Sequence, residues 1–128
     1  MSLKIDPVIV RSDSRGMVFE PLETAMIASQ RNTHVVISKP GVVRGNHYHR
    51  QGTEIITVVG PALVRTRESG KLRDIAVPDQ QVYRFTFPPG MPHAIKNTAD
   101  RPNVLVAFNT CTHDPDNPDT VQDILLES

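Results

Sequence analysis

The chain has 128 residues, of which 38% are hydrophobic and 5% aromatic, and its 14 basic and 14 acidic residues cancel. This length suits one domain with a working core, whereas two halves of that size would be too small to stabilise themselves. The balanced charge argues against nucleic acid or an anionic membrane as a partner, and a single cysteine, Cys111, excludes an internal disulfide.

Two further features concern the compartment. A lone cysteine fits a reducing environment, and residues 1–6 show no apolar run behind a basic start, as a signal peptide would. The longest apolar stretches, such as Ile55–Val59, are too short to cross a bilayer. The sequence therefore predicts a cytoplasmic protein.

Eleven prolines and seven glycines divide the chain into short segments rich in Val, Ile, Thr and Phe. Such segments between turn residues are typical of strands, and several of them alternate in polarity. The expected strands are Val8–Val10, His34–Ser38, Thr53–Val59, Ala62–Arg67, Leu72–Val77, Gln81–Phe87, His93–Asn97 and Val104–Asn109. Many short strands with Gly and Pro turns indicate an all-β fold, an antiparallel sandwich or barrel.

Helical periodicity is weak and is confined to two segments. Glu20–Gln30 and Thr120–Glu127 are the segments that support a short helix or turn. The stretch His113–Asp119 is acidic and broken by proline, which predicts a surface loop or terminal arm. We expect one domain over 1–128, with a barrel core at about 30–112, an N-terminal arm at 1–29 and a C-terminal arm at 113–128.

Histidines and one glutamate suggest a metal site. His47 and His49 are two residues apart, so that on a strand both side chains leave the same face. Glu54 follows a turn at Gly52, and His93 follows a proline-rich turn that begins another strand. Three imidazoles and one carboxylate suit Zn, Fe, Mn, Ni or Co and leave coordination positions open for a substrate.

The spacing of these residues resembles the two motifs of the cupin superfamily. The first motif is read as Gly41, His47, His49, Glu54 and Gly60, and the second as Pro88, Gly90, His93 and Asn97. This resemblance implies a double-stranded β-helix, or jelly-roll barrel, that holds one metal ion on His47, His49, Glu54 and His93.

A narrower resemblance concerns cupins that remodel sugar nucleotides. The segment 38–49 and the turn at 13–16 are similar to those of dTDP-4-dehydrorhamnose 3,5-epimerases and sugar 3,4-ketoisomerases. The segment 39–49, the Pro-Pro-Gly turn at 88–90 and the ending 114–120 most resemble the C-terminal cupin domain of the capsular polysaccharide assembly (CapF) family. That likeness implies zinc and epimerisation at C3 of a nucleotide-linked 4-keto sugar in polysaccharide biosynthesis.

Other site residues follow from the chemistry of that reaction. If His47 is a ligand it cannot also be the base. Another histidine or a metal-bound water could then act as the base, and Tyr83 is a candidate catalytic residue on the opposite face of the sugar. Arg44, Lys39 and Arg84 are candidates to bind the diphosphate of the substrate, because cationic side chains match phosphate oxygens. Two other functions stay open: an Fe(II)-dependent dioxygenase acting on a small molecule, and a non-catalytic sugar-binding module.

Two kinds of protein partner are expected. The apolar segment Leu3–Val10 would suit an edge strand that is exchanged between the two chains of a homodimer. The capsular family joins its cupin to a reductase domain, and the resemblance therefore also implies a separate reductase as a possible partner.

Overall fold

The computed structural model describes residues 2–128 as two five-stranded sheets, one two-stranded hairpin and a short helix. In chain order the elements are β1 (Lys4–Pro7), β2 (Arg11–Asp13), β3 (Gly16–Val18), α1 (Thr24–Ile27), β4 (Asn32–Ser38), β5 (Val43–His49), β6 (Glu54–Val59), β7 (Ala62–Glu68), β8 (Lys71–Val77), β9 (Val82–Phe87), β10 (His93–Asn97), β11 (Asn103–Asn109) and β12 (Thr120–Gln122).

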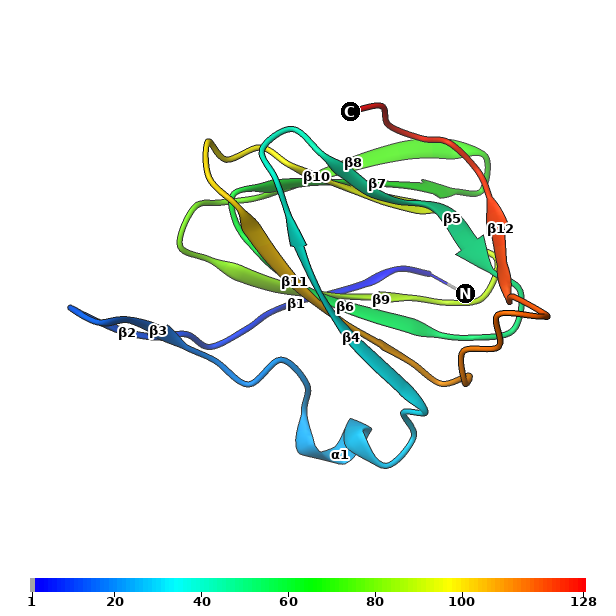
Figure 1. Ribbon diagram of the computed structural model, residues 1–128, viewed down its shortest axis with the longest axis horizontal. Helices are drawn as coiled ribbons and strands as arrows, with labels where there is room; N and C mark the ends of the chain where they lie inside the picture. Colours follow the sequence, from blue (N-terminus) through cyan, green and yellow to red (C-terminus); the bar gives the residue numbers. More distant parts are fainter. Residues whose placement is uncertain (1) are drawn as a thin grey trace.

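The two sheets face each other as a sandwich (Figure 1). One has the strand order β1-β9-β6-β11-β4 and the other β12-β5-β10-β7-β8, and every strand pair is antiparallel. The β2–β3 hairpin projects away from both sheets (Figure 1). The all-β cupin-type sandwich expected from the sequence is therefore confirmed.

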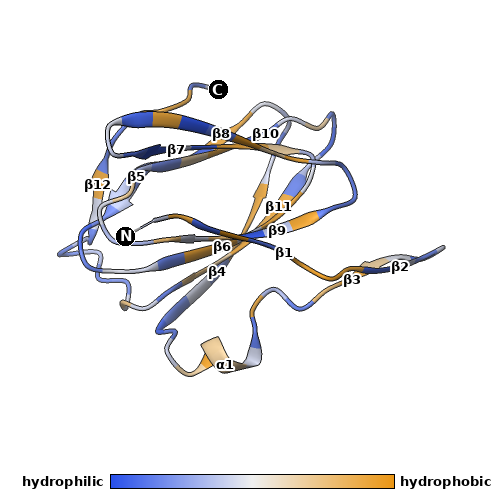
Figure 2. Cartoon of the chain, turned by 180° about the vertical axis from the view of Figure 1, so that it is seen from behind, coloured by the Kyte–Doolittle hydropathy of each residue, from blue (hydrophilic) through white to orange (hydrophobic). Residues whose placement is uncertain are grey.

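Alternation along the strands divides each sheet into an inner and an outer face. On β6, Ile56 and Val58 belong to the buried core, whereas Thr57 between them faces outward and donates a hydrogen bond to Pro21 O. Hydrophilic and hydrophobic segments follow one another along the edge strand β8 (Figure 2), of which Val77 is the buried residue. Period-two patterning thus places side chains at positions 54, 56 and 58 on the inner face.

The segment before β4 lies on the outer face of the sheet that contains β6 and β9. Arg84 on β9 donates hydrogen bonds to the carbonyls of Pro21 and Glu20, and it is only 8% exposed. The helix α1 follows within Glu20–Gln30, where the sequence allowed a short helix. Within residues 2–128 no helix has both the length and the apolar character needed to cross a membrane.

Two expectations at the ends of the chain are corrected. The first strand is Lys4–Pro7 rather than Val8–Val10, and in this chain it pairs with its own β9. The segment Thr120–Glu127, where the sequence allowed a short helix or turn, instead begins with strand β12, whose Val121 lies opposite Tyr48 on β5. Pairing with an available sheet edge has overridden a weak helical preference. Exchange of the first strand in a homodimer stays a prediction.

Candidate metal centre

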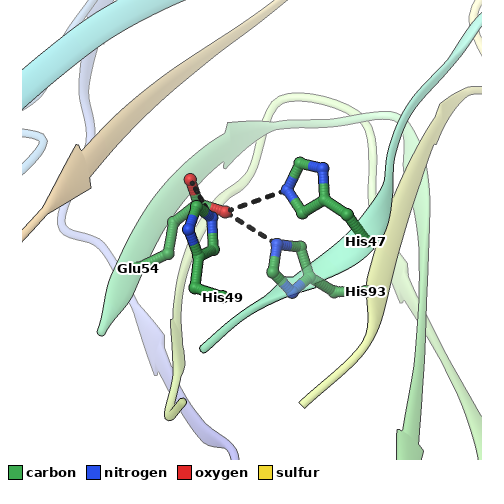
Figure 3. A group of neighbouring side chains, drawn as sticks. All are labelled: His47, His49, Glu54 and His93. Carbon is green, nitrogen blue, oxygen red and sulfur yellow. Dashed lines mark hydrogen bonds and ion pairs between the residues drawn. The ribbon is translucent and has the colours of Figure 1, made fainter. Parts of the chain in front are cut away.

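Four side chains far apart in the sequence converge between the two sheets. His47 and His49 project from β5 and His93 from the adjacent β10, while Glu54 reaches them from β6 in the opposite sheet. Their potential ligand atoms all lie within 4.8 Å of one another. Figure 3 shows His47 and His93 directed at the same carboxylate oxygen of Glu54.

A bulge in β5 sets the direction of its two histidines. His93 lies opposite His47, but the next residue, Ala94, lies opposite Gly45, so Asn46 is an extra residue in β5. Gly45 and Asn46 have positive φ values of 89° and 58°. A Cβ on Gly45 would lie 2.8 Å from His93 O, and this close approach of the two strands therefore requires glycine.

His93 is held on three sides and is almost fully buried. Its Nδ1–H donates to Met91 O at 3.0 Å, and the Phe87 ring stacks on the imidazole at a centroid distance of 4.0 Å. Its Nε2 lies 2.7 Å from Glu54 Oε1. An imidazole nitrogen and a carboxylate oxygen are both metal ligands, so a cation could bind between His93 and Glu54.

The other two histidines approach the same carboxylate less closely. His47 Nε2 lies 3.8 Å from Glu54 Oε1, and His49 Nε2 lies 3.3 Å from Glu54 Oε2. His49 Nε2 is nevertheless buried without a hydrogen-bond partner, because the geometry of that contact is unsuitable. An orphaned ring nitrogen aimed at a carboxylate is costly unless another group, such as a metal cation, satisfies it.

The electrostatics of the cluster favour an ionised glutamate. Burial acts to raise the pKa of Glu54, but contacts with His47, His49 and His93 outweigh it and hold the pKa well below its ordinary value. Burial acts to lower the pKa of His49, but Glu54 and Asp119 outweigh it and raise the pKa. The centre is therefore a buried carboxylate surrounded by imidazoles, which attracts a cation.

The donor set and its spacing fit a divalent transition metal. Three imidazole nitrogens and one carboxylate oxygen are typical ligands of zinc and of its first-row neighbours, with bonds of about 2.0–2.2 Å. The potential ligand atoms lie within 4.8 Å of one another, so small rotations of the side chains would let all four reach one ion placed between them. The cluster could therefore hold a metal ion, whose identity the donor set leaves open.

A cavity of about 410 Å³ opens beside the cluster, within the range of about 300–1,000 Å³ for small-molecule sites. It is lined by Asn32, Thr33, His34, His47, His49, Glu54, Asn109, Cys111, Thr112, His113, Asp114, Pro118, Asp119 and Thr120. No lysine or arginine is among these lining residues within 2–128. The cavity thus offers no permanently charged cation to a ligand.

The other residues predicted for the site lie elsewhere. Tyr83 packs against the hydrophobic core, and its ring is separated from His93 by the rings of Phe85 and Phe87 in series. The structure does not bring Tyr83 to the cluster, and its catalytic role stays a prediction without geometric support.

The three predicted substrate-binding cations also lie outside the cavity lining. Arg84 faces the outer side of its sheet, where it binds the carbonyls of Pro21 and Glu20. Arg44 donates to Ser38 Oγ at 3.1 Å, and Lys39 is exposed in the turn before β5. None of them contacts a ligand of the cluster, and their roles stay predictions.

Two residues of the cavity, His34 and Asp119, were not predicted as site residues from the sequence. His34 lies on the inner face of β4, and Asp119 lies in the loop before β12. A signal for His34 existed: His34, Val36 and Ser38 alternate along an expected strand, and Val36 is apolar. No local signal marks Asp119, because its contacts join residues more than 60 positions apart.

Comparisons with known proteins agree with this geometry. The family described as "Polysaccharide biosynthesis C-terminal domain" matches residues 11–121. The UDP-2-acetamido-2,6-beta-L-arabino-hexul-4-ose reductase of Pseudomonas aeruginosa is 31% identical over 116 residues, which are 88% of this chain and 30% of that protein. The chain thus spans less than a third of the length of this relative.

Solved structures show the same fold. The capsular polysaccharide assembling protein CapF from Staphylococcus aureus matches with a TM-score of 0.69 and 28% identity, over 94% of this chain and 33% of that one. The dTDP-4-dehydrorhamnose 3,5-epimerase from Sulfolobus tokodaii matches with a TM-score of 0.67 and 25% identity, over 89% of this chain and 73% of that one.

Proposed function

The chain belongs to the family of polysaccharide biosynthesis C-terminal domains, and from this premise we propose that it is a metal-binding cupin that epimerises or isomerises a nucleotide-linked 4-keto sugar. The convergence of His47, His49, Glu54 and His93 beside a cavity carries the proposal. The names of the Pseudomonas and Sulfolobus relatives, "hexul-4-ose" and "4-dehydrorhamnose", both describe sugars with a keto group at C4.

The chemistry of a 4-keto sugar explains why such a centre is useful. The keto group makes the hydrogen on the neighbouring C3 acidic, and removal of this proton leaves negative charge on the keto oxygen. A divalent metal, zinc first and Fe, Mn, Ni or Co otherwise, would supply a Lewis acid that stabilises this charge. The chain must then supply a base that is not itself a ligand.

His34 is the residue we assign as that base. It lies on β4, on the same inner face as Val36, which packs against the core, and it lines the cavity together with His47 and His49. Imidazole is the side chain best suited to exchanging protons near neutral pH. His34 lies outside the cluster of four, and its Nδ1 lies 3.4 Å from Asn32 Oδ1, so Nε2 is the nitrogen that would accept the proton from C3.

The lining of the cavity suggests how a nucleotide sugar would lie. The absence of lysine and arginine from the lining, within the described part of the chain, disfavours a diphosphate inside the cavity. We therefore place the sugar ring in the cavity and the diphosphate outside it. Arg44 and Lys39 remain candidates to contact the diphosphate there.

Proton exchange in deuterium oxide tests this function. The zinc-loaded protein is incubated with a UDP- or dTDP-4-keto-6-deoxy sugar, and deuterium at C3 is measured by mass spectrometry. We expect incorporation with the wild-type chain and a loss of about 100-fold or more in His34→Gln, since general base catalysis contributes typically 10²–10⁴-fold. His113→Gln is the matched control, because it removes an imidazole that lines the same cavity from the loop.

Other results would redirect the proposal. Unchanged exchange in His34→Gln with loss in His113→Gln would move the base to the loop. Binding of the sugar without exchange would indicate a non-catalytic sugar-binding module. Oxygen consumption with iron, and no exchange at C3, would indicate a dioxygenase instead.

A further inference from the structure

His49 differs from His93 in the groups that contact its second ring nitrogen. His93 Nδ1 rests on a backbone carbonyl, that of Met91. His49 Nδ1 instead faces two side chains, Asn109 Nδ2 at 3.4 Å and Asp119 Oδ2 at 3.6 Å. The orientation and protonation of the His49 ring therefore depend on residues from β11 and from the loop that follows it.

Asp119 forms hydrogen bonds with the loop that joins His49 to Glu54. Its carboxylate accepts hydrogen bonds from Gln51 N at 3.0 Å and from Gly52 N at 2.9 Å, and its carbonyl accepts one from Arg50 N at 2.9 Å. These residues join His49 to Glu54. Two hydrogen bonds hold the carboxylate and a third holds the backbone of Asp119, whose side chain is mostly buried, at 23% exposure. Asp119 is thus a fixed acceptor beside His49.

The two neighbours of His49 Nδ1 favour opposite tautomers of its ring. Asn109 Oδ1 accepts from Cys111 N at 2.8 Å, which directs the donating Nδ2 of Asn109 at His49. An amide NH₂ group requires an unprotonated Nδ1, whereas a carboxylate requires Nδ1–H. Only the second tautomer leaves the lone pair on Nε2, the nitrogen that lies 3.3 Å from Glu54.

We propose that Asp119 is a positioning residue of the metal centre: it accepts the Nδ1–H of His49 and so directs the Nε2 lone pair at the ion. The assignment rests on the metal site of the proposed function and adds the group that orients one of its ligands. A carboxylate behind a ligating histidine fixes its tautomer and raises its basicity, and loss of such a group costs about 10–100-fold in metal affinity.

The test compares two carboxylates that line the same cavity. Asp119→Asn removes the acceptor behind His49, whereas Asp114→Asn removes a charge from a loop residue that has no contact with the cluster. The zinc dissociation constant is measured for the full chain by competition with a chromophoric chelator. In parallel, long-range ¹H–¹⁵N spectra of the zinc-loaded wild-type chain report which nitrogen of His49 carries the proton.

We expect Asp119→Asn to raise the zinc dissociation constant about 10–100-fold, and Asp114→Asn to leave it within about twofold. The wild-type spectra should show a His49 Nδ1–H that is protected from exchange with water. Equal affinities for the two variants, or an unprotonated Nδ1, would overturn the role of Asp119 while leaving the metal site intact. Should Asp119→Asn fail to fold, the wild-type spectra decide alone. Failure of the wild-type chain to bind zinc or any of the other metals would overturn both proposals.

Discussion

The interior between the two sheets contains two adjacent layers of side chains, one with the polar metal ligands and one that is apolar. The ligand layer contains Glu54, Phe87, His93 and Asn109, on four different strands, together with His47 and His49 on the adjacent strand β5. The core layer consists of Ile56, Phe85, Ile95 and Ala107, which lie two residues away from Glu54, Phe87, His93 and Asn109 on the same four strands. The residues of each layer lie opposite one another on the paired strands β9, β6 and β11. Because the two layers are two residues apart along each strand, the metal centre lies about 6–7 Å from the apolar core.

This comparison shows that one backbone pattern serves two purposes. Alternation sends both layers inward, and only the residue types differ. The ligand layer borders the cavity, through Glu54 and Asn109, whereas the core layer is closed on all sides. A change in one layer should therefore affect metal affinity, and a change in the other should affect the free energy of unfolding.

The largest effect is expected in the ligand layer. His93→Ala removes a ligand and the ring that stacks on Phe87. The zinc dissociation constant, measured by chelator competition, should rise well beyond the about 10–100-fold that follows loss of an outer residue. His113→Ala, a cavity histidine outside the cluster, should change it little. Comparable losses in both variants would contradict the assignment of the ligands.

Phe85→Ala tests the core layer. Phe85 is fully buried, at 0% exposure, and its replacement by alanine should lower the free energy of unfolding by about 3–5 kcal/mol. Urea denaturation with zinc removed measures this loss. The zinc affinity of the folded chain should change by no more than a few-fold, and a loss as large as that of His93→Ala would show that the layers are not separable.

A smaller effect is expected on the outer face. Arg84→Ala removes the guanidinium donors to the carbonyls of Pro21 and Glu20, so that Pro21 O keeps only the hydrogen bond from Thr57. The free energy of unfolding should fall by about 1–3 kcal/mol. Lys39→Ala, at an exposed turn, should change it by less than about 0.5 kcal/mol. Neither variant should change zinc affinity. A loss of affinity in Arg84→Ala would mean that the outer face communicates with the ligand layer.

The smallest effect concerns pH. The pKa of His49 is raised from 6.5 in the folded, metal-free chain, so its contribution to stability is present below that value and is lost as pH rises through the folded pKa. The depressed pKa of Glu54 keeps the contribution of Glu54 to stability constant above the unfolded pKa of 4.5.

Zinc competes with protons for the imidazoles, so the stabilising effect of zinc should grow with pH. The Tm difference between zinc-loaded and metal-free chains should widen from about pH 6 to pH 8; a constant difference would contradict this.

Much of the ligand layer could be predicted from the sequence. The spacing of His47, His49, Glu54 and His93 is a local pattern, and the turn residues around it indicate where strands begin. The convergence of these side chains is confirmed by the structure. Strand alternation likewise indicates the core layer, because period-two patterns are visible in single segments such as Val82–Phe87.

The rest depends on contacts that no single segment encodes. The wall of the cavity is formed by pairing of β4 with β11 and by hydrogen bonds of the loop before β12, which place His34 and Asp119 beside the cluster. Arg44 is a predicted diphosphate-binding residue because it adjoins the first motif, but proximity in sequence does not place a side chain in a cavity. The strand β12 was missed because its pairing with β5 joins residues more than 70 positions apart.

The measurement that tests the central claim most directly is X-ray absorption at the zinc edge of the loaded protein. We predict one zinc per chain with nitrogen and oxygen ligands at about 2.0–2.1 Å, from His47, His49, His93 and Glu54. A sulfur ligand at about 2.3 Å would place the ion on Cys111, which lines the same cavity. Such a signal, or a chain that takes up no metal, would contradict the account.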